Sequence, residues 1–96
     1  MYQAVADGQV DVAAGFSTDG RIDAFDLAVL GDPKQAFPPY DAVVLLSPRA
    51  AKNQNLVHAI EPLLNRISVT AMRAANRLVD EDGESPRESA RQLLAD

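Results

Sequence analysis

The sequence predicts one small α/β domain, residues 1–96, in which helices cover a short mixed sheet in the order α-β-β-β-α-α-α. Two observations predict this class. Between residues 10 and 46 the apolar residues come in short runs rich in Val and Leu, which are typical of strands. From residue 55 onwards the apolar residues recur with the period of amphipathic helices. A chain of this length can build an adequate but modest core.

The composition is that of a globular protein, and it excludes several classes of function. The apolar fraction of 47% and the charged fraction of 24% are ordinary values for a folded domain. A net charge of −5, with the arginines scattered among acids, argues against a nucleic-acid binder. The absence of cysteine excludes a disulfide framework and a thiolate metal site. The single histidine, His58, excludes a multi-histidine metal site within one chain.

The sequence shows no recognisable targeting segment. No apolar run approaches the length that is needed to span a bilayer. The first residues lack the basic region and the apolar region that make up a signal peptide. We therefore expect either a protein that stays inside the cell or a piece of a longer, exported chain.

The first quarter of the chain predicts a helix, a strand and a helical turn. Met1–Asp7 has apolar residues on one side and is followed by Gly8, which is typical of a helix terminus. Val10–Phe16 is an apolar run rich in Val and predicts a buried strand. The hydroxyl and carboxylate side chains of Ser17–Asp23 are suited to capping a short helical turn at Gly20–Phe25.

Two further strands are predicted before the midpoint of the chain. Leu27–Leu30 is the second strand candidate and ends at the turn residues Gly31–Pro33. The prolines of Phe37–Tyr40 fix φ and favour extended geometry in the residues before them, so this corner cannot be helical. Asp41–Leu46 is the third strand candidate, closed by Ser47–Pro48.

The second half of the chain predicts three helices. Asn55–Ile67 is amphipathic, and Pro62 predicts a kink or break within it. Ser68–Val79 forms the next helix, with its serine as the cap. Ser85–Glu88 combines a capping serine, a proline at the first helical position and a glutamate, and starts a helix towards Leu94. The residues expected on the buried faces of the last two helices are Met72, Ala75, Leu78, Val79, Ala90, Leu93 and Leu94.

No arrangement of residues predicts an enzyme. Asp19 and Asp23 are four residues apart and could serve as paired acid/base carboxylates on one helical face. A capping aspartate beside a surface aspartate is the favoured alternative. Ser17 and His58 could be drawn into a catalytic triad, but the serine does not lie in a G-x-S-x-G turn.

No cofactor or metal is predicted either. The glycines at positions 15, 20 and 31 do not have the spacing of a phosphate-binding loop. The acidic residues of Asp80–Glu84 lack the alternating ligand pattern of a calcium loop, which favours a solvated turn.

Two of the scarce aromatic residues follow or precede predicted strands. Phe16 ends the first strand candidate, and Tyr40 stands immediately before the third. The ends of strands are where ligands bind in α/β sheets. An exposed aromatic face there could hold an apolar cation, which cannot be hydrogen-bonded and is recognised by cation–π contact and shape. The residues alone favour the alternative, in which both rings belong to the core.

A long part of the sequence resembles a known family. The run GQVDVAAGFSTDGRIDAFDLAVLGDPKQAFPPYDAV contains a G-x-V-D-V strand, an aromatic-S-T-D turn, a D-L-x-V-L strand and an F-P-P-Y-D corner. In this order the motifs resemble the C-terminal part of the substrate-binding proteins of ABC importers for glycine betaine, choline, carnitine and proline betaine. The run LLNRISVTAMRAANRLVDEDGESPRESARQLL resembles the closing helices of that family. The resemblance therefore covers nearly the whole chain.

The resemblance implies a fold, a ligand and a place of action. The fold would be a partial lobe of a type II periplasmic-binding-protein-like structure, which closes on a quaternary ammonium ligand in the extracytoplasmic space and carries no catalytic activity. Phe16 and Tyr40 match the aromatic residues that surround the methylated cation, although Phe16 stands where the family usually has tyrosine. Thr18 and Asp19 match the S-T-D motif, and would either line the cleft or hold the turn. The full-length protein would act with an ABC permease.

The chain departs from the family in length. A full receptor of this type is more than twice as long, so one copy of this chain would not enclose a ligand. Its strands would lack neighbours, and open edges favour pairing between copies. We therefore predict a homodimer or higher oligomer, with domain swapping as one route. The alternative function is a non-catalytic oligomerising or regulatory module that keeps the fold and binds no ligand.

Overall fold

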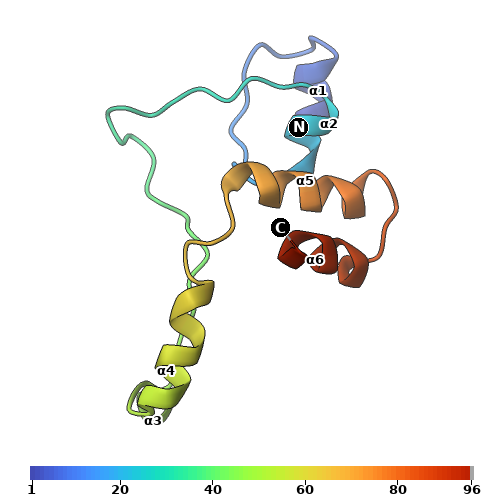
Figure 1. The fold of residues 1–96 in the computed structure, drawn as a ribbon. Helices are drawn as coiled ribbons and strands as arrows, with labels where there is room; N and C mark the ends of the chain where they lie inside the picture. The colour runs from blue at the N-terminus through green and yellow to red at the C-terminus, as the bar shows by residue number, and fades with distance from the viewer. Residues whose placement is uncertain (96) are drawn as a thin grey trace. The chain divides into compact units, whose positions relative to one another are not determined.

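The computed structural model describes residues 1–95, and the contacts of the chain group into two compact units. The first unit combines Met1–Leu30 with Ile67–Asp96, and the second is Gly31–Arg66. The helices, in chain order, are α1 (Tyr2–Ala6), α2 (Gly20–Ala24), α3 (Pro48–Ala51), α4 (Gln54–Ile60), the 3₁₀ helix η1 (Glu61–Leu63), α5 (Val69–Asp80) and α6 (Pro86–Ala95) (Figure 1). None of the helices within residues 1–95 is both long and apolar enough to cross a lipid bilayer.

Side-chain caps begin three helices of the first unit, α2, α5 and α6, at the places that the sequence predicts. The Asp19 carboxylate accepts a hydrogen bond of 3.0 Å from the backbone N–H of Arg21 at the start of α2. Ser68 and Ser85 accept backbone hydrogen bonds of 3.1 Å and 3.2 Å at the starts of α5 and α6. The predicted helical turn at residues 20–25 and the last two predicted helices are therefore confirmed, as is the N-terminal helix, α1.

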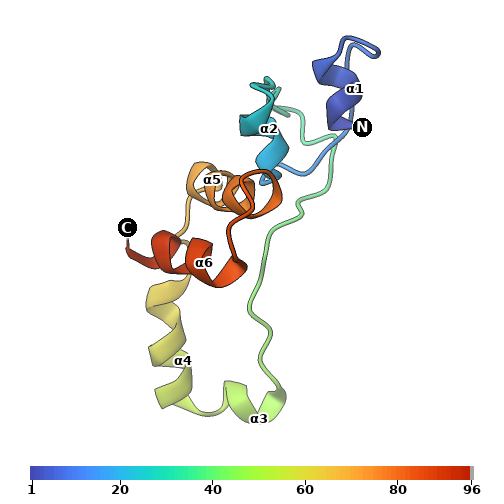
Figure 2. The ribbon, with the colours of Figure 1, turned by 90° about the vertical axis from the view of Figure 1, so that its right-hand side faces the viewer.

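Helix α5 is the centre of the first unit, because it packs against both α2 and α6. The ribbon shows α5 and α6 side by side in two views (Figures 1 and 2). The hydroxyl of Ser89, buried on α6, donates a hydrogen bond of 2.8 Å to the carbonyl of Ala75 on α5. Tyr2 and Ile22 are the buried apolar residues of this unit. Ala90 and Leu94 are exposed, so the prediction that they are buried is wrong.

The approach of α2 to α5 is so close that it requires a glycine. A Cβ atom on Gly20 would stand 2.5 Å from the Cα of Arg77 and 2.8 Å from the carbonyl carbon of Asn76, and would also meet the backbone nitrogen of Arg77. These are backbone atoms of α5, which cannot rotate away as a side chain can. The missing side chain at position 20 therefore lets the first turn of α2 rest directly on the backbone of α5.

The second unit is built from a long irregular segment followed by short helices. Helix α3 was not predicted; it begins where Ser47 accepts a hydrogen bond of 3.1 Å from the backbone N–H of Ala50. Asn53 caps α4 in the same manner. The predicted helix at residues 55–67 does break at Pro62, which lies in η1, and its regular part ends at Ile60.

The predicted sheet is wrong, and with it the α/β class, the order α-β-β-β-α-α-α and the partial periplasmic-binding-protein lobe. Residues 1–95 contain no strand (Figure 1). The three predicted strands are instead irregular chain: Val10–Phe16, Leu27–Leu30 and Asp41–Leu46. They leave large apolar side chains exposed, of which Leu45 is the most exposed at 88%. A β-strand forms only where a neighbouring strand makes hydrogen bonds with its backbone N–H and C=O groups. An apolar run predicts the preference for a strand, but it cannot supply that neighbour.

Replacing Gly20 by alanine is expected to destabilise the first unit. The added Cβ would force α2 away from α5, and overpacking of this kind lowers the free energy of unfolding by about 1–3 kcal/mol. Urea unfolding followed by the helical circular dichroism signal measures the change. Gly31→Ala is the matched control, because a Cβ at Gly31 meets no atom within 4 Å. Equal losses of stability in the two variants would contradict the packing argument.

Candidate functional site

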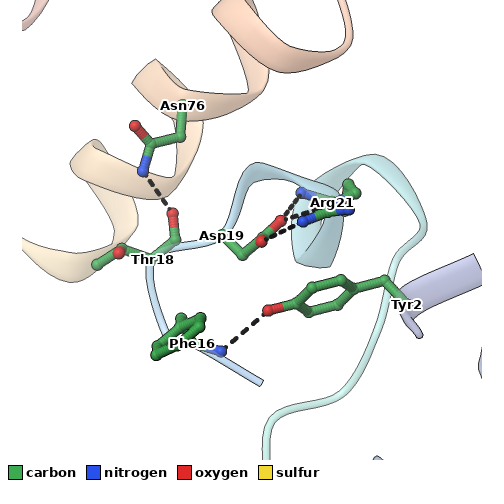
Figure 3. Close-up of polar contacts among 6 residues, drawn as sticks. All are labelled: Tyr2, Phe16, Thr18, Asp19, Arg21 and Asn76. Atoms are coloured by element: carbon green, nitrogen blue, oxygen red, sulfur yellow. Dashed lines mark hydrogen bonds and ion pairs between the residues drawn. The ribbon is translucent and has the colours of Figure 1, made fainter. Parts of the chain in front are cut away.

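The segment Phe16–Gly20, here called the STD turn, is attached to α5 by two long-range hydrogen bonds. The Nε of Arg73 donates to the carbonyl of Ser17 at 2.8 Å. The amide nitrogen of Asn76 donates to the carbonyl of Thr18 at 2.7 Å (Figure 3). These bonds join residues 56 and 58 positions apart in the sequence. The side chains of α5 thus supply the donors that a neighbouring strand would otherwise provide to the carbonyls of the turn.

An ion pair between Asp19 and Arg21 lies at the C-terminal end of the STD turn, where α2 begins. The Nε of Arg21 donates to one oxygen of Asp19 at 2.9 Å, and a terminal guanidinium nitrogen of Arg21 donates to the other oxygen at 2.7 Å. This two-pronged geometry is the strong form of an arginine–carboxylate pair. The hydrogen bond from the Arg21 side chain is the main cause that lowers the pKa of Asp19 to about 2, with the backbone N–H of Arg21 helping and desolvation opposing. The same hydrogen bond raises the pKa of Arg21.

Tyr2 lies beneath this pair and reaches the STD turn from the N-terminal helix. Its side chain is only 8% exposed, and its hydroxyl accepts a hydrogen bond of 2.9 Å from the backbone N–H of Phe16 (Figure 3). The guanidinium carbon of Arg21 stands 4.5 Å from the centre of the Tyr2 ring, which is cation–π distance. One arginine therefore bonds to the capping carboxylate and covers the aromatic ring at the same time.

Sequence reasoning missed four of the side chains that build this region: Tyr2, Arg21, Arg73 and Asn76. Tyr2 carried one usable signal, since a tyrosine on the apolar side of a short helix needs a hydrogen-bond partner for its hydroxyl when it is buried. The two residues on α5 carried none, because nothing in the sequence places that helix against the STD turn.

Three of the four predicted site residues lie in the first unit. Phe16 presents a ring that is 60% exposed at the start of the STD turn, and Thr18 and Asp19 are half-buried within it. The carboxylate of Asp19 is engaged by Arg21, as described above. The sequence disfavours an acid/base pair of Asp19 and Asp23, and the contacts agree. Asp23 lies 3.8 Å from the guanidinium of Arg73, so each carboxylate faces its own arginine.

The fourth predicted residue, Tyr40, belongs to the second unit, where its side chain is 87% exposed. The chain before it is shaped by Asp32, whose carboxylate oxygens accept hydrogen bonds of 2.9 Å from the backbone N–H groups of Ala36 and Phe37. These two hydrogen bonds lower the pKa of Asp32, and the bond from Phe37 has the larger effect. A hollow of about 310 Å³ opens beside this loop and is lined by Asp32, Gln35, Phe37, Pro38 and Pro39.

Comparison with known proteins identifies the family. Residues 1–96 match the OpuAC family, described as the substrate binding domain of ABC-type glycine betaine transport systems. The chain belongs to this family, and the resemblance that the motifs indicate is confirmed.

Two characterised relatives show how much of such a protein the chain represents. The carnitine transport binding protein OpuCC of Listeria monocytogenes is 38% identical over 95 residues, which cover 98% of this chain and 31% of that protein. The glycine-betaine-binding protein of Pseudomonas aeruginosa is 30% identical over 95 residues, 98% of this chain and 30% of that protein. The chain thus spans less than a third of the length of these relatives. No solved structure matches it significantly.

The charge on Asp19 is expected to stabilise the first unit in a pH-dependent manner. Its pKa is about 2 in the folded protein against an ordinary value of 3.8, so its contribution is complete above about pH 4 and is lost as the pH falls towards 2. Asp19→Asn keeps a good helix cap but removes the charge. The difference in unfolding free energy between wild type and Asp19→Asn, measured by urea unfolding, should therefore be larger at pH 6 than at pH 2.

Asp11→Asn is the charge-matched control for this measurement, because Asp11 is an exposed aspartate of the segment that precedes the STD turn. It should change the unfolding free energy at pH 6 less than Asp19→Asn does. A difference for Asp19→Asn that stays constant between pH 6 and pH 2 would contradict the ion-pair argument.

Proposed function

We propose that the chain is a substrate-binding segment of an ABC importer for quaternary ammonium osmoprotectants, namely glycine betaine, choline, carnitine or proline betaine. The observation that carries this proposal is the match of residues 1–96 to one family of substrate-binding domains. The printed names of the relatives, a carnitine transport binding protein and a glycine-betaine-binding protein, support the same class of ligand. In the full-length protein the segment would act outside the cytoplasm with an ABC permease, and without catalysis.

Phe16 and Tyr40 are proposed as the contacts to the methylated cation. A quaternary ammonium group has no N–H to donate, so a protein recognises it by the electron-rich faces of aromatic rings and by shape. Both rings are exposed, at 60% and 87%, which supports this role over burial in a core. A phenylalanine ring has a less negative face than tyrosine and lacks its hydroxyl. We therefore infer weaker cation binding through Phe16 than a tyrosine at that position would give.

Thr18 and Asp19 are proposed to hold the STD turn in place. The carbonyl of Thr18 is bonded to Asn76, and the carboxylate of Asp19 caps α2 and pairs with Arg21. These contacts favour the supporting role over direct contact with the ligand. The two residues would then affect ligand affinity through the position of the neighbouring Phe16 ring.

A second proposal concerns association between copies. The segment Asp41–Leu46 carries large apolar side chains that are open to water, with Leu45 at 88%. Large apolar side chains exposed in succession, as here, favour an interaction site or aggregation. We infer that the isolated chain forms a homodimer or higher oligomer through this segment, with exchange of the segment between copies as one route.

Titration of the ¹⁵N-labelled chain with glycine betaine, choline and carnitine tests the ligand proposal by NMR, which detects weak binding. We expect chemical-shift changes at the amides around Phe16 and Tyr40. Phe16→Ala and Tyr40→Ala should each raise the dissociation constant about threefold to tenfold, because each removes one cation–π contact. Phe16→Tyr should lower it.

Phe37→Ala is the matched control for this titration, since Phe37 lies in the same corner as Tyr40 and its ring is 71% exposed. Its removal should leave the dissociation constant unchanged. If none of the three ligands shifts any amide, the chain binds no quaternary ammonium compound by itself, and the oligomerising or regulatory module is the better assignment.

Light scattering at tens of micromolar tests the association proposal. The wild-type chain should give a mass of at least twice 10.3 kDa. Leu45→Lys places a charge in the proposed contact and should shift the mass towards the monomer. Leu94→Lys, at an exposed leucine of the other unit, is the control and should leave the mass unchanged. A monomeric wild-type chain at these concentrations would contradict the proposal.

A further inference from the structure

Tyr2 contacts the backbone of Phe16, but its own ring is too buried to bind a ligand cation. Tyr2 is 8% exposed, whereas the Phe16 ring beside it is 60% exposed. One face of the Tyr2 ring already carries the guanidinium of Arg21 at 4.5 Å. A ligand cation therefore reaches the ring of Phe16 and not that of Tyr2. Any effect of Tyr2 on such a ligand must pass through Phe16.

The backbone of Phe16 is held on both sides. Its N–H donates to the Tyr2 hydroxyl at 2.9 Å, and its carbonyl accepts from the backbone N–H of Asp19 at 3.1 Å. The two peptide groups of a residue set the direction in which its Cα–Cβ bond points. The tyrosine hydroxyl thus restrains the direction in which the Phe16 side chain leaves the turn. This bond reaches across 14 residues, so the turn cannot form it from its own atoms.

Tyr2 is itself fixed by the segment that it supports. Arg21 covers one face of its ring and is held there by two hydrogen bonds to Asp19. At Gly15 the backbone lies against the edge of the ring, where an added Cβ would stand 2.9 Å from both Cε1 and the hydroxyl oxygen. A glycine directly before Phe16 is therefore needed for the tyrosine to reach the Phe16 N–H.

We propose that Tyr2 is a positioning residue that places the ring of Phe16 for contact with a methylated cation, acting through its hydroxyl. The ligand part of this inference rests on the proposed function. The position of Phe16 itself rests on the contacts among Tyr2, Gly15, Phe16 and Arg21.

The test compares wild type with Tyr2→Phe, which removes the hydroxyl but keeps the ring and its cation–π partner. Amide hydrogen exchange, measured without ligand, should become about threefold to tenfold faster at Phe16, because one hydrogen bond is lost. Exchange at Leu27 should not change, since its N–H bonds to the carbonyl of Ile22. Gly15→Ala should reproduce the faster exchange at Phe16 by displacing the Tyr2 ring, with Gly31→Ala as its control.

Titration with tetramethylammonium and glycine betaine then tests the route to the ligand. Tyr2→Phe should raise the dissociation constant about twofold to tenfold in the wild-type background. It should have no effect in the Phe16→Ala background, because the ring that it positions is absent. A merely structural loss of stability would weaken binding in both backgrounds.

The outcomes separate this inference from the proposed function. Unchanged exchange at Phe16 in Tyr2→Phe overturns the inference, whatever the ligand does. An equal loss of affinity in both backgrounds also overturns it, because Tyr2 would then act by another route. If the wild type binds neither probe, the proposed function fails, and faster exchange at Phe16 alone still supports the placement of its backbone by Tyr2.

Discussion

The contact between the STD turn and α5 is the constraint on which the first unit depends. Gly20 rests on the backbone of α5 at Arg77, while Arg73 and Asn76 on the same helix donate to the two carbonyls just before the α2 cap. A turn that follows irregular chain has no strand ladder of its own to satisfy these carbonyl groups. Helix α5 therefore does what a neighbouring strand does in a sheet, using side-chain donors in place of backbone donors.

The negative charge of the STD turn is balanced by the neighbouring Arg21 of α2, and this affects how the turn could recognise a ligand. Asp19 belongs to the same turn as the proposed cation contact Phe16, but its carboxylate is already paired with Arg21 and engaged as the cap of α2. A carboxylate committed in this way attracts a second cation only weakly, because the guanidinium cancels most of its field. Recognition by this turn would then depend on the aromatic ring of Phe16 and on the backbone that orients it.

The sequence predicted the helices well because their signals are local. Asp19, Ser68 and Ser85 cap helices where expected, and Pro62 interrupts one. The motif at Ser47–Arg49 repeats the Ser-Pro-Arg start found at Ser85. Its place after an apolar run predicts the end of a strand, but Ser47 caps α3 instead. The strand predictions were wrong because the signal for a strand is not local. A strand needs a pairing partner, which can lie anywhere in the chain or in another chain. The same limit hid the roles of Tyr2 and Asn76, whose contacts join distant segments.

The two proposed cation contacts differ in how their surroundings are built. Hydrogen bonds between the STD turn and the helices α1 and α5, spanning 14 to 58 residues of sequence, set the backbone around Phe16. The loop before Tyr40 is shaped by Asp32, which bonds to residues four and five positions further on. The relatives are about three times as long as this chain, and Tyr40 is the more exposed of the two rings. Long-range contacts within the chain therefore place Phe16. The surroundings of Tyr40 are the ones that we would expect additional chain, or a second copy, to complete.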